Sequence, residues 1–325
     1  MPLDVNVFAS TGLARLPHHG AFLRAFHDGL QRAGETVRWV DGDYLPCDVA
    51  VVYGYPKPDS RSTWACRSVH AQHRGPVIVI ETPFLGRAPY IERRGLRALW
   101  RRLRGKRNLV DPQSYARIGI DGAFQDDGDF CNAGSPPDRW QQLSREFGLT
   151  LQPFRKQGSQ VLIVGQKPGD ASLRGADIVA WMIDTARRLR ACTDRPIVVR
   201  AHPASRPEDF GRMKKAFATH TDVRLDIPPT GTIHDALCGA WAAVTYSSSA
   251  AIDALLAGIP AISTIPASMA WPVTDHELSM IDQPTLYPRE QWLYDLCYAQ
   301  WSVEETASGA VWARLKARVL QKLGA

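Results

Sequence analysis

The sequence predicts an α/β protein made of two doubly wound domains. Short apolar runs rich in Val and Ile, at residues 49–53, 77–81 and 161–164, suit strands buried on both faces of a parallel sheet. A turn and then a stretch with helical periodicity follow these runs, which is the order of a βαβ unit. At 325 residues the chain is long enough for two such domains, each with its own core.

The first predicted domain spans residues 1–155. We expect its strands at residues 3–9, 37–40, 49–53 and 77–81, and its helices at residues 21–33 and 60–73. Residues 110–155 are rich in Gly, Asp and Pro, and we expect residues 119–130 to form a long functional loop. The acidic residues of this run lack the ligand spacing of an EF-hand, so we do not predict a calcium site there.

The second predicted domain spans residues 156–287 and opens with a strand at residues 161–164. We expect further strands at residues 197–200, 223–226, 243–246 and 261–264, and helices at residues 176–191, 207–218, 232–238 and 248–257. Residues 288–325 are predicted to be wholly helical.

Two stretches of the second domain carry most of the functional signal. Residues 196–203 end in Arg200-Ala-His202-Pro203, and residues 243–260 contain Ser247-Ser248-Ser249. Each begins as an apolar, β-branched run and turns polar where a loop should follow the strand. Because ligands of open α/β sheets bind at the carboxyl ends of strands, we expect both stretches to line one site on neighbouring strands.

The three serines indicate the start of a helix. Ser247 or Ser248 is expected to cap it, and its first turn would present unpaired N–H groups and a positive dipole end to a phosphate. Asp253, further along, is placed to accept hydrogen bonds from ribose hydroxyls. Taken separately, the serines suit any capped helix and His202 suits an ordinary loop. Together they favour a ligand that carries phosphate.

Composition sets outer limits on the function. No run approaches eighteen apolar residues and the N-terminus lacks a secretory signal, so we expect a cytoplasmic protein that is not an integral membrane protein. The six cysteines are scattered without a CxxC pair, which favours reduced thiols over disulfides or zinc. The net charge of +6 favours an anionic partner.

Residues 160–265, read in order, resemble the capsule-polysaccharide synthesis family, which includes Kdo transferases. The matching elements are residues 161–172 (VLIVGQKPGDAS), the Arg200-Ala-His202-Pro203 motif, and residues 247–260 with their three serines and final Gly-Ile-Pro. The resemblance implies a GT-B glycosyltransferase, in which two Rossmann-like domains face a cleft and C-terminal helices pack back on the first domain.

The same resemblance implies where the substrates bind. The second domain would hold a nucleotide-sugar, a UDP-sugar or a CMP-sugar, and the first domain the acceptor. The implied donor-binding residues are Gln166, Asp170, Ser172, Arg200, His202, Ser247, Ser248, Ser249 and Asp253. GT-B enzymes commonly work without a divalent metal, and no DxD-like pair lies beside these stretches, so we expect no metal.

Residues 288–305 are similar to proteins encoded by bacteriophages. Phages use glycosyltransferases to modify hydroxymethylated pyrimidines in their own DNA, so this similarity favours a 5-hydroxymethylpyrimidine in DNA as the acceptor. A base inside a duplex would have to be extruded before it could react.

The basic segment, residues 87–107, is the second argument for a DNA acceptor. It contains nine basic residues and one acidic residue. Its candidate acceptor-binding and DNA-binding residues are Arg87, Arg93, Arg94, Arg97, Trp100, Arg101 and Arg104. The same segment suits an interfacial helix at a membrane, where capsule or lipopolysaccharide acceptors are found, or an ordinary solvated face.

Three residues are candidates for the catalytic base that an inverting reaction requires. Asp121, in its Gly-flanked loop, is the first choice, and Glu81 and His19 are the others. Each also has a structural interpretation: Glu81 could orient Arg87 or Arg117, and His19 could cap the following helix. The alternatives to a DNA glycosyltransferase are a surface-glycan (Kdo-type) transferase, a non-catalytic DNA-binding module and a UDP-sugar epimerase.

Overall fold

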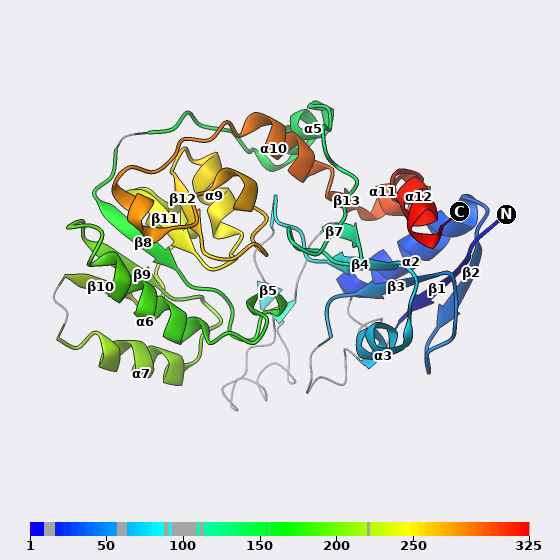
Figure 1. Cartoon of the computed structure of the whole chain (residues 1–325), viewed down its shortest axis with the longest axis horizontal. Coiled ribbons are helices and arrows are strands. Elements are labelled where there is room, and N and C mark those ends of the chain that lie inside the picture. Colours follow the sequence, from blue (N-terminus) through cyan, green and yellow to red (C-terminus); the bar gives the residue numbers. More distant parts are fainter. Residues whose placement is uncertain are drawn as a thin grey trace. The chain divides into compact units, whose positions relative to one another are not determined.

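The computed structural model describes residues 1–9, 17–56, 64–87, 91–92, 109–110, 114–155, 157–219 and 222–324. The chain forms two compact units (Figure 1). The first unit consists of Met1–Ala123, Gly128–Ala133 and Cys297–Ala325, and the second consists of Phe124–Asp127 and Gly134–Leu296.

The first unit is built on a six-stranded sheet in the order β13-β7-β4-β3-β1-β2. Strands β1 to β4 are parallel, whereas β7 runs antiparallel to both β4 and β13. The strands are β1 (Asp4–Phe8), β2 (Thr36–Val40), β3 (Val49–Tyr53), β4 (Val77–Glu81), β7 (Tyr115–Ile120) and β13 (Gln300–Ser302). The helices are α2 (Pro17–Arg32), α3 (Trp64–Gln72), α11 (Val303–Ser308) and α12 (Ala310–Leu323).

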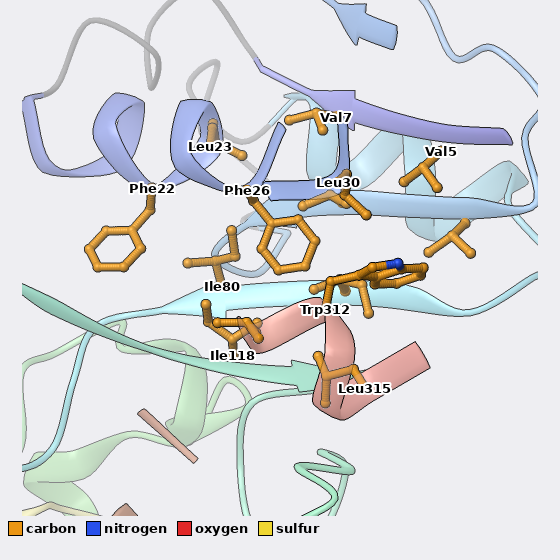
Figure 2. Close-up of a cluster of buried hydrophobic side chains, with 14 of the residues drawn as sticks. Val5, Val7, Phe22, Leu23, Phe26, Leu30, Ile80, Ile118, Trp312 and Leu315 are labelled. Carbon is orange, nitrogen blue, oxygen red and sulfur yellow. The ribbon is translucent and has the colours of Figure 1, made fainter. Parts of the chain in front are cut away.

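The core of the first unit joins the two ends of the chain. Figure 2 shows Trp312 and Leu315 of α12 packed with the apolar face of α2, including Phe26, and with sheet residues such as Ile80 and Ile118. All five side chains are at most 2% exposed. The C-terminal helices therefore pack on the first unit, as the family resemblance implied.

The prediction of an entirely helical C-terminal segment is wrong at one place. Gln300, Trp301 and Ser302 form β13, which pairs with β7 at the edge of the first sheet. This strand has three residues and lies between two helices, so only its partner strand reveals it. The helix before it, α10 (Glu290–Cys297), lies almost wholly in the second unit, where the Trp292 indole donates to the carbonyl of Met269 at 2.9 Å.

The second unit has a five-stranded sheet, wholly parallel, in the order β10-β9-β8-β11-β12. The strands are β8 (Gln160–Val164), β9 (Ile197–Arg200), β10 (Val223–Asp226), β11 (Ala240–Thr245) and β12 (Ala261–Ser263). The α-helices are α5 (Asp138–Phe147), α6 (Ile178–Leu189), α7 (Pro207–Ala216), α8 (Ile233–Leu237), α9 (Ala250–Leu256) and α10, and the 3-10 helices are η2 (Ala171–Leu173), η3 (Trp271–Val273) and η4 (Leu278–Asp282).

The region predicted to be irregular, residues 110–155, contains regular elements. Its first part forms β7, and Asp138–Phe147 forms α5, which ends at Gly148 in the left-handed conformation. A ribbon of two short strands, β5 (Ile91–Glu92) and β6 (Leu109–Val110), precedes them and pairs antiparallel. The expected loop at residues 119–130 thus begins with the last two residues of a buried strand.

Candidate functional site

Because the five strands of the second sheet are parallel, all of them end on the same side of the sheet. We call this side, where the strands have their carboxyl ends, the carboxyl edge. β8 lies between β9 and β11, so the stretches that contain His202 and Ser247 both flank β8. The prediction that they lie on neighbouring strands is therefore wrong. β9 and β11 are two strand spacings apart, which is about 10 Å. Gln166 follows β8, the strand between them.

Gly165 lets the chain turn closely over the end of β8. Its amide donates to the Arg200 carbonyl at 2.8 Å, and an added Cβ would lie 2.8 Å from the sulfur of Met182 on α6. A side chain at this position would require the Met182 side chain to move. The close approach brings Gln166 to the edge of the sheet with only 7% of its surface exposed.

Gln166, Ser172 and Ser247 form one hydrogen-bonded cluster. The Gln166 Nε2 donates to the hydroxyl of Ser172 and, at 3.1 Å, to that of Ser247. Its Oε1 accepts the Ser247 amide at 3.3 Å, and the two serine hydroxyls are 3.0 Å apart. Ser172 is 3% exposed, whereas Ser247 is half-buried. Three residues from two distant stretches thus meet at the carboxyl ends of β8 and β11.

Asp170 fixes the position of Ser172 within this cluster. Its carboxylate accepts the Ser172 amide at 3.1 Å and the Ser172 hydroxyl at 2.9 Å, and it is the N-cap of η2. A capping carboxylate holds a short helix end that is otherwise unsatisfied. This geometry gives Asp170 a positioning role, while its contact with a donor stays a prediction.

The N-terminus of α9 differs from the one predicted from the sequence. Ser249 is the N-cap and makes no side-chain capping bond, and the Ser248 hydroxyl accepts the Ala250 amide at 3.3 Å. The amides of Ala251 and Ile252 donate to the carbonyls of Ser248 and Ser249 at 3.1 and 2.9 Å. The expectation of unpaired amides is therefore wrong for these residues. Polar contacts at this end would come chiefly from the serine hydroxyls.

Two further polar residues belong to the same part of the sheet. Asp253 lies half-buried in the first turn of α9, and its predicted contact with ribose stays a prediction. Thr245 ends β11 and is 0% exposed, and its Oγ1 has no hydrogen-bond partner within the described ranges. Thr245 is the last residue of β11, and Ser247 follows it two residues on. Sequence reasoning missed it, because a threonine in a strand is an ordinary β-former.

Arg200 holds a loop in place. Its guanidinium, 6% exposed as a side chain, forms an ion pair with Asp226 and donates to the carbonyls of Thr230 and Gly231 at 2.8 and 2.9 Å. These partners occupy the fork of the guanidinium. The geometry favours an indirect role in which Arg200 stabilises residues 226–231, rather than the donor contact that the resemblance implied.

His202 follows the carboxyl end of β9 and is half-buried. Its Nδ1 accepts the amide of Ala204 at 3.0 Å. A neutral imidazole with an accepting Nδ1 carries its proton on Nε2. His202 can therefore donate a hydrogen bond from Nε2, as a phosphate-binding role requires.

The candidate bases of the first unit lie at opposite edges of its sheet. Asp121 follows the last residue of β7, which is antiparallel, so it lies beside Val77 at the amino ends of the parallel strands. Its carboxylate accepts the Val77 amide at 2.9 Å and Lys322 Nζ at 2.8 Å. Because ligands of such sheets bind at the opposite edge, this geometry gives Asp121 a structural role.

Glu81 and His19 lie at the carboxyl edge. Glu81 ends β4, its Oε1 accepts the Thr82 amide at 2.7 Å, and its Oε2 lies 4.0 Å from the point that a Cβ on Gly54 would occupy. The His19 ring packs 4.0 Å from the ring of Tyr53, the last residue of β3. Burial, and secondarily the charge of His18, lowers the pKa of His19 to about 4. His19 is thus a neutral imidazole at pH 7.

Among the candidate acceptor-binding residues of the basic segment, Arg87 alone lies within the described residues, and it is exposed. Arg93, Arg94, Arg97, Trp100, Arg101 and Arg104 lie outside the described residues. In the part of the chain that the structure covers, no group of three or more His, Cys, Asp or Glu side chains could hold a metal ion. None of the described helices is long and apolar enough to cross a membrane.

Comparison with known proteins gives structural matches without sequence matches. No protein-family model matches the chain, and no curated protein matches it. The β-Kdo 2,4-transferase KpsC of Thermosulfurimonas dismutans matches with a TM-score of 0.56 and 18% identity, over 93% of this chain and 92% of that one. The fold is GT-B.

Two weaker matches have TM-scores below 0.5 and support no further argument. They are the β-Kdo 2,7-transferase KpsC of the same organism (TM-score 0.46, 14% identity, 97% of this chain and 99% of that one) and the UDP-GlcNAc 2-epimerase of Methanocaldococcus jannaschii, solved with UDP-GlcNAc and UDP (0.31, 12%, 87% and 91%).

Proposed function

We propose that this protein is a glycosyltransferase that binds a nucleotide-sugar at the carboxyl edge of the sheet in its second unit. The observation that carries the proposal is the Gln166–Ser172–Ser247 cluster on a GT-B fold. Two of these side chains are more than nine-tenths buried, and their mutual hydrogen bonds hold the polar groups in one arrangement, which suits the binding of a polar ligand.

The chemistry of the surrounding groups suits a phosphate leaving group. Breaking a sugar–phosphate bond places negative charge on the departing phosphate, and fixed donors stabilise that charge. The hydroxyls of Ser248 and Ser249 and the Nε2–H of His202 are such donors. We propose that they act without a divalent metal, so that transfer should survive EDTA.

For the base we propose Glu81 in place of Asp121. An inverting transfer needs a group that accepts the proton of the acceptor hydroxyl, and a carboxylate at the carboxyl edge of the first sheet is suited to that role. The Thr82 amide orients one oxygen of Glu81, and no hydrogen bond within the described ranges holds the other. His19, neutral at pH 7, is the second choice.

Two acceptors follow from different observations. The fold shared with the KpsC Kdo transferase favours a surface glycan and a CMP-sugar donor. The basic segment favours a 5-hydroxymethylpyrimidine in DNA and a UDP-sugar donor. Incubation with each donor and acceptor, followed by mass analysis of the product, distinguishes them by which acceptor gains a sugar.

The first test measures nucleotide binding. UDP, GDP and CMP should be screened for an increase in melting temperature, and we expect one of them to raise it. Gln166→Ala and Ser247→Ala should each lower the affinity for that nucleotide about tenfold or more, because each removes hydrogen bonds from the cluster. Ser144→Ala, which loses only the bond to the Gln141 carbonyl on α5, is the matched control. The proposal fails if no nucleotide stabilises the protein or if all three variants bind alike.

A further inference from the structure

Trp271 and His276 form a stacked aromatic pair after β12. Their ring centroids are 3.3 Å apart and the planes differ by 6°. Trp271 is half-buried and His276 is exposed. Neither residue was predicted to have a function. A parallel pair of rings with solvent-accessible surface is the kind of platform on which a further planar ring can stack.

The loop that carries Trp271 is held rigidly. The Trp271 amide donates to the Ser268 carbonyl at 3.0 Å, and the hydroxyls of Ser268 and Ser263 are 3.0 Å apart. The Met269 carbonyl accepts the indole of Trp292 at 2.9 Å. A platform that is already ordered requires little additional ordering when a ligand binds.

The second ring is held by an extension of the sheet. Asp275 pairs in parallel with Ile262, and its carboxylate accepts the Thr285 amide at 2.8 Å. Ile262 belongs to a buried apolar cluster with Val244 and with Met182 of α6, which we call the α6-face core cluster, so Asp275 points to that face as well. His276, the next residue in an extended chain, points to the opposite face.

That opposite face is also the face of Thr245. Val244 belongs to the α6-face core cluster, so Thr245, the next residue and the last of β11, points to the other side, and Ser247 follows it just beyond the end of the strand. β12 pairs with β11, and the Asp275 segment pairs with β12, so two strand spacings, about 10 Å, separate the Ser247 and His276 chain segments laterally. The base and the terminal phosphate of a nucleoside diphosphate lie a comparable distance apart.

We propose that the Trp271–His276 stack binds the base of the donor nucleotide, with the phosphates at the serine-bearing end of β11. This inference rests on the proposed function and adds a base-stacking subsite to it. Stacking is tolerant of base identity, because every base has a π face. The platform therefore provides affinity for the nucleoside part as such, and discrimination among bases comes from other contacts.

The test separates the base from the phosphates. Dissociation constants of UDP, CMP and inorganic pyrophosphate should be measured by titration calorimetry for the wild-type chain, Trp271→Leu, His276→Ala and the double variant. Trp39→Leu is the matched control, since Trp39 is an exposed tryptophan (38%) on β2 of the first unit. Melting temperatures report whether each variant folds. If Trp271→Leu does not fold, His276→Ala still tests the proposal, because His276 is exposed.

The expected result is a selective loss of nucleotide affinity. The double variant should bind the preferred nucleotide roughly five- to a hundredfold more weakly, while pyrophosphate binding and the Trp39→Leu control are unchanged. Nucleotide affinity that is unchanged in His276→Ala and in the double variant overturns the platform and leaves the proposed function standing. Equal weakening of nucleotide and pyrophosphate also overturns it. A wild-type chain that binds no nucleotide overturns both proposals.

Discussion

Removal of the Glu35 carboxylate should destabilise the first unit selectively. Glu35 follows α2, and its side chain is 0% exposed. Its oxygens accept the Leu3 amide at 2.8 Å, the Trp312 indole N–H at 2.8 Å and Lys316 Nζ at 2.6 Å. One carboxylate thus joins the first strand region to the C-terminal helix.

The magnitude follows from the groups that would lose their acceptor. In Glu35→Ala, the Leu3 amide and the Trp312 indole N–H would both be left without it, at about 1–3 kcal/mol each. Lys316 is 37% exposed and can turn to water, so its share is about 1 kcal/mol or less. We expect Glu35→Ala to cost about 2–7 kcal/mol, and the control Arg38→Met, which removes the exposed cation of an ion pair with Asp4, to cost about 1 kcal/mol or less.

The effect should also depend on pH. Burial opposes ionisation of Glu35, but the hydrogen bonds from Lys316, Leu3 and Trp312 outweigh it and hold the pKa of the carboxyl below its ordinary value. A carboxyl with a lowered folded-state pKa stabilises the fold above its unfolded-state pKa, and this contribution is lost as the pH falls through the folded-state pKa. The difference between wild type and Glu35→Gln should therefore shrink in acid.

Urea unfolding followed by circular dichroism at pH 7, repeated at lower pH, measures these differences. All four residues belong to the first unit, so its transition should move while that of the second unit stays in place. The reasoning is refuted if Glu35→Ala costs less than Arg38→Met, or if the wild-type advantage over Glu35→Gln grows in acid.

Three further predictions address the proposed base and the second unit. Glu81→Gln should lower the rate of sugar transfer about 10²- to 10⁴-fold, whereas Asp121→Asn should lower the melting temperature and leave the transfer rate intact. Steady-state rates and melting curves of both variants measure this. A slow Asp121→Asn and an active Glu81→Gln would refute it. Arg200→Met should destabilise the second unit by about 3–5 kcal/mol in urea, because Asp226 would keep a nearly buried charge (11% exposed) without its cation. Gly258→Ala should cost more than about 1–2 kcal/mol, since the glycine has a φ of 73° and an added Cβ would lie 2.1 Å from a backbone oxygen; an unchanged melting temperature would contradict it.

The local pattern of the sequence was enough to predict much of the fold. The β-branched runs at Val49–Tyr53 and Val77–Glu81 form strands with the predicted bounds, because a buried parallel strand needs a continuous apolar run whatever surrounds it. The family resemblance implied that Gln166, Ser172 and Ser247 all belong to the donor site. The structure joins these side chains by hydrogen bonds, and their contact with a donor stays a prediction.

Tertiary structure alone decided which residues share an edge and what each side chain contacts. Asp121 lies at the amino edge because β7 runs antiparallel, and strand direction is set by pairing with β4 rather than by the residues of β7. Arg200 is held by Asp226, and Trp271 stacks on His276, through contacts that no local spacing encodes. A sequence determines where strands and turns occur through short-range sterics and periodicity, whereas strand order and side-chain partners depend on packing between segments far apart in the chain.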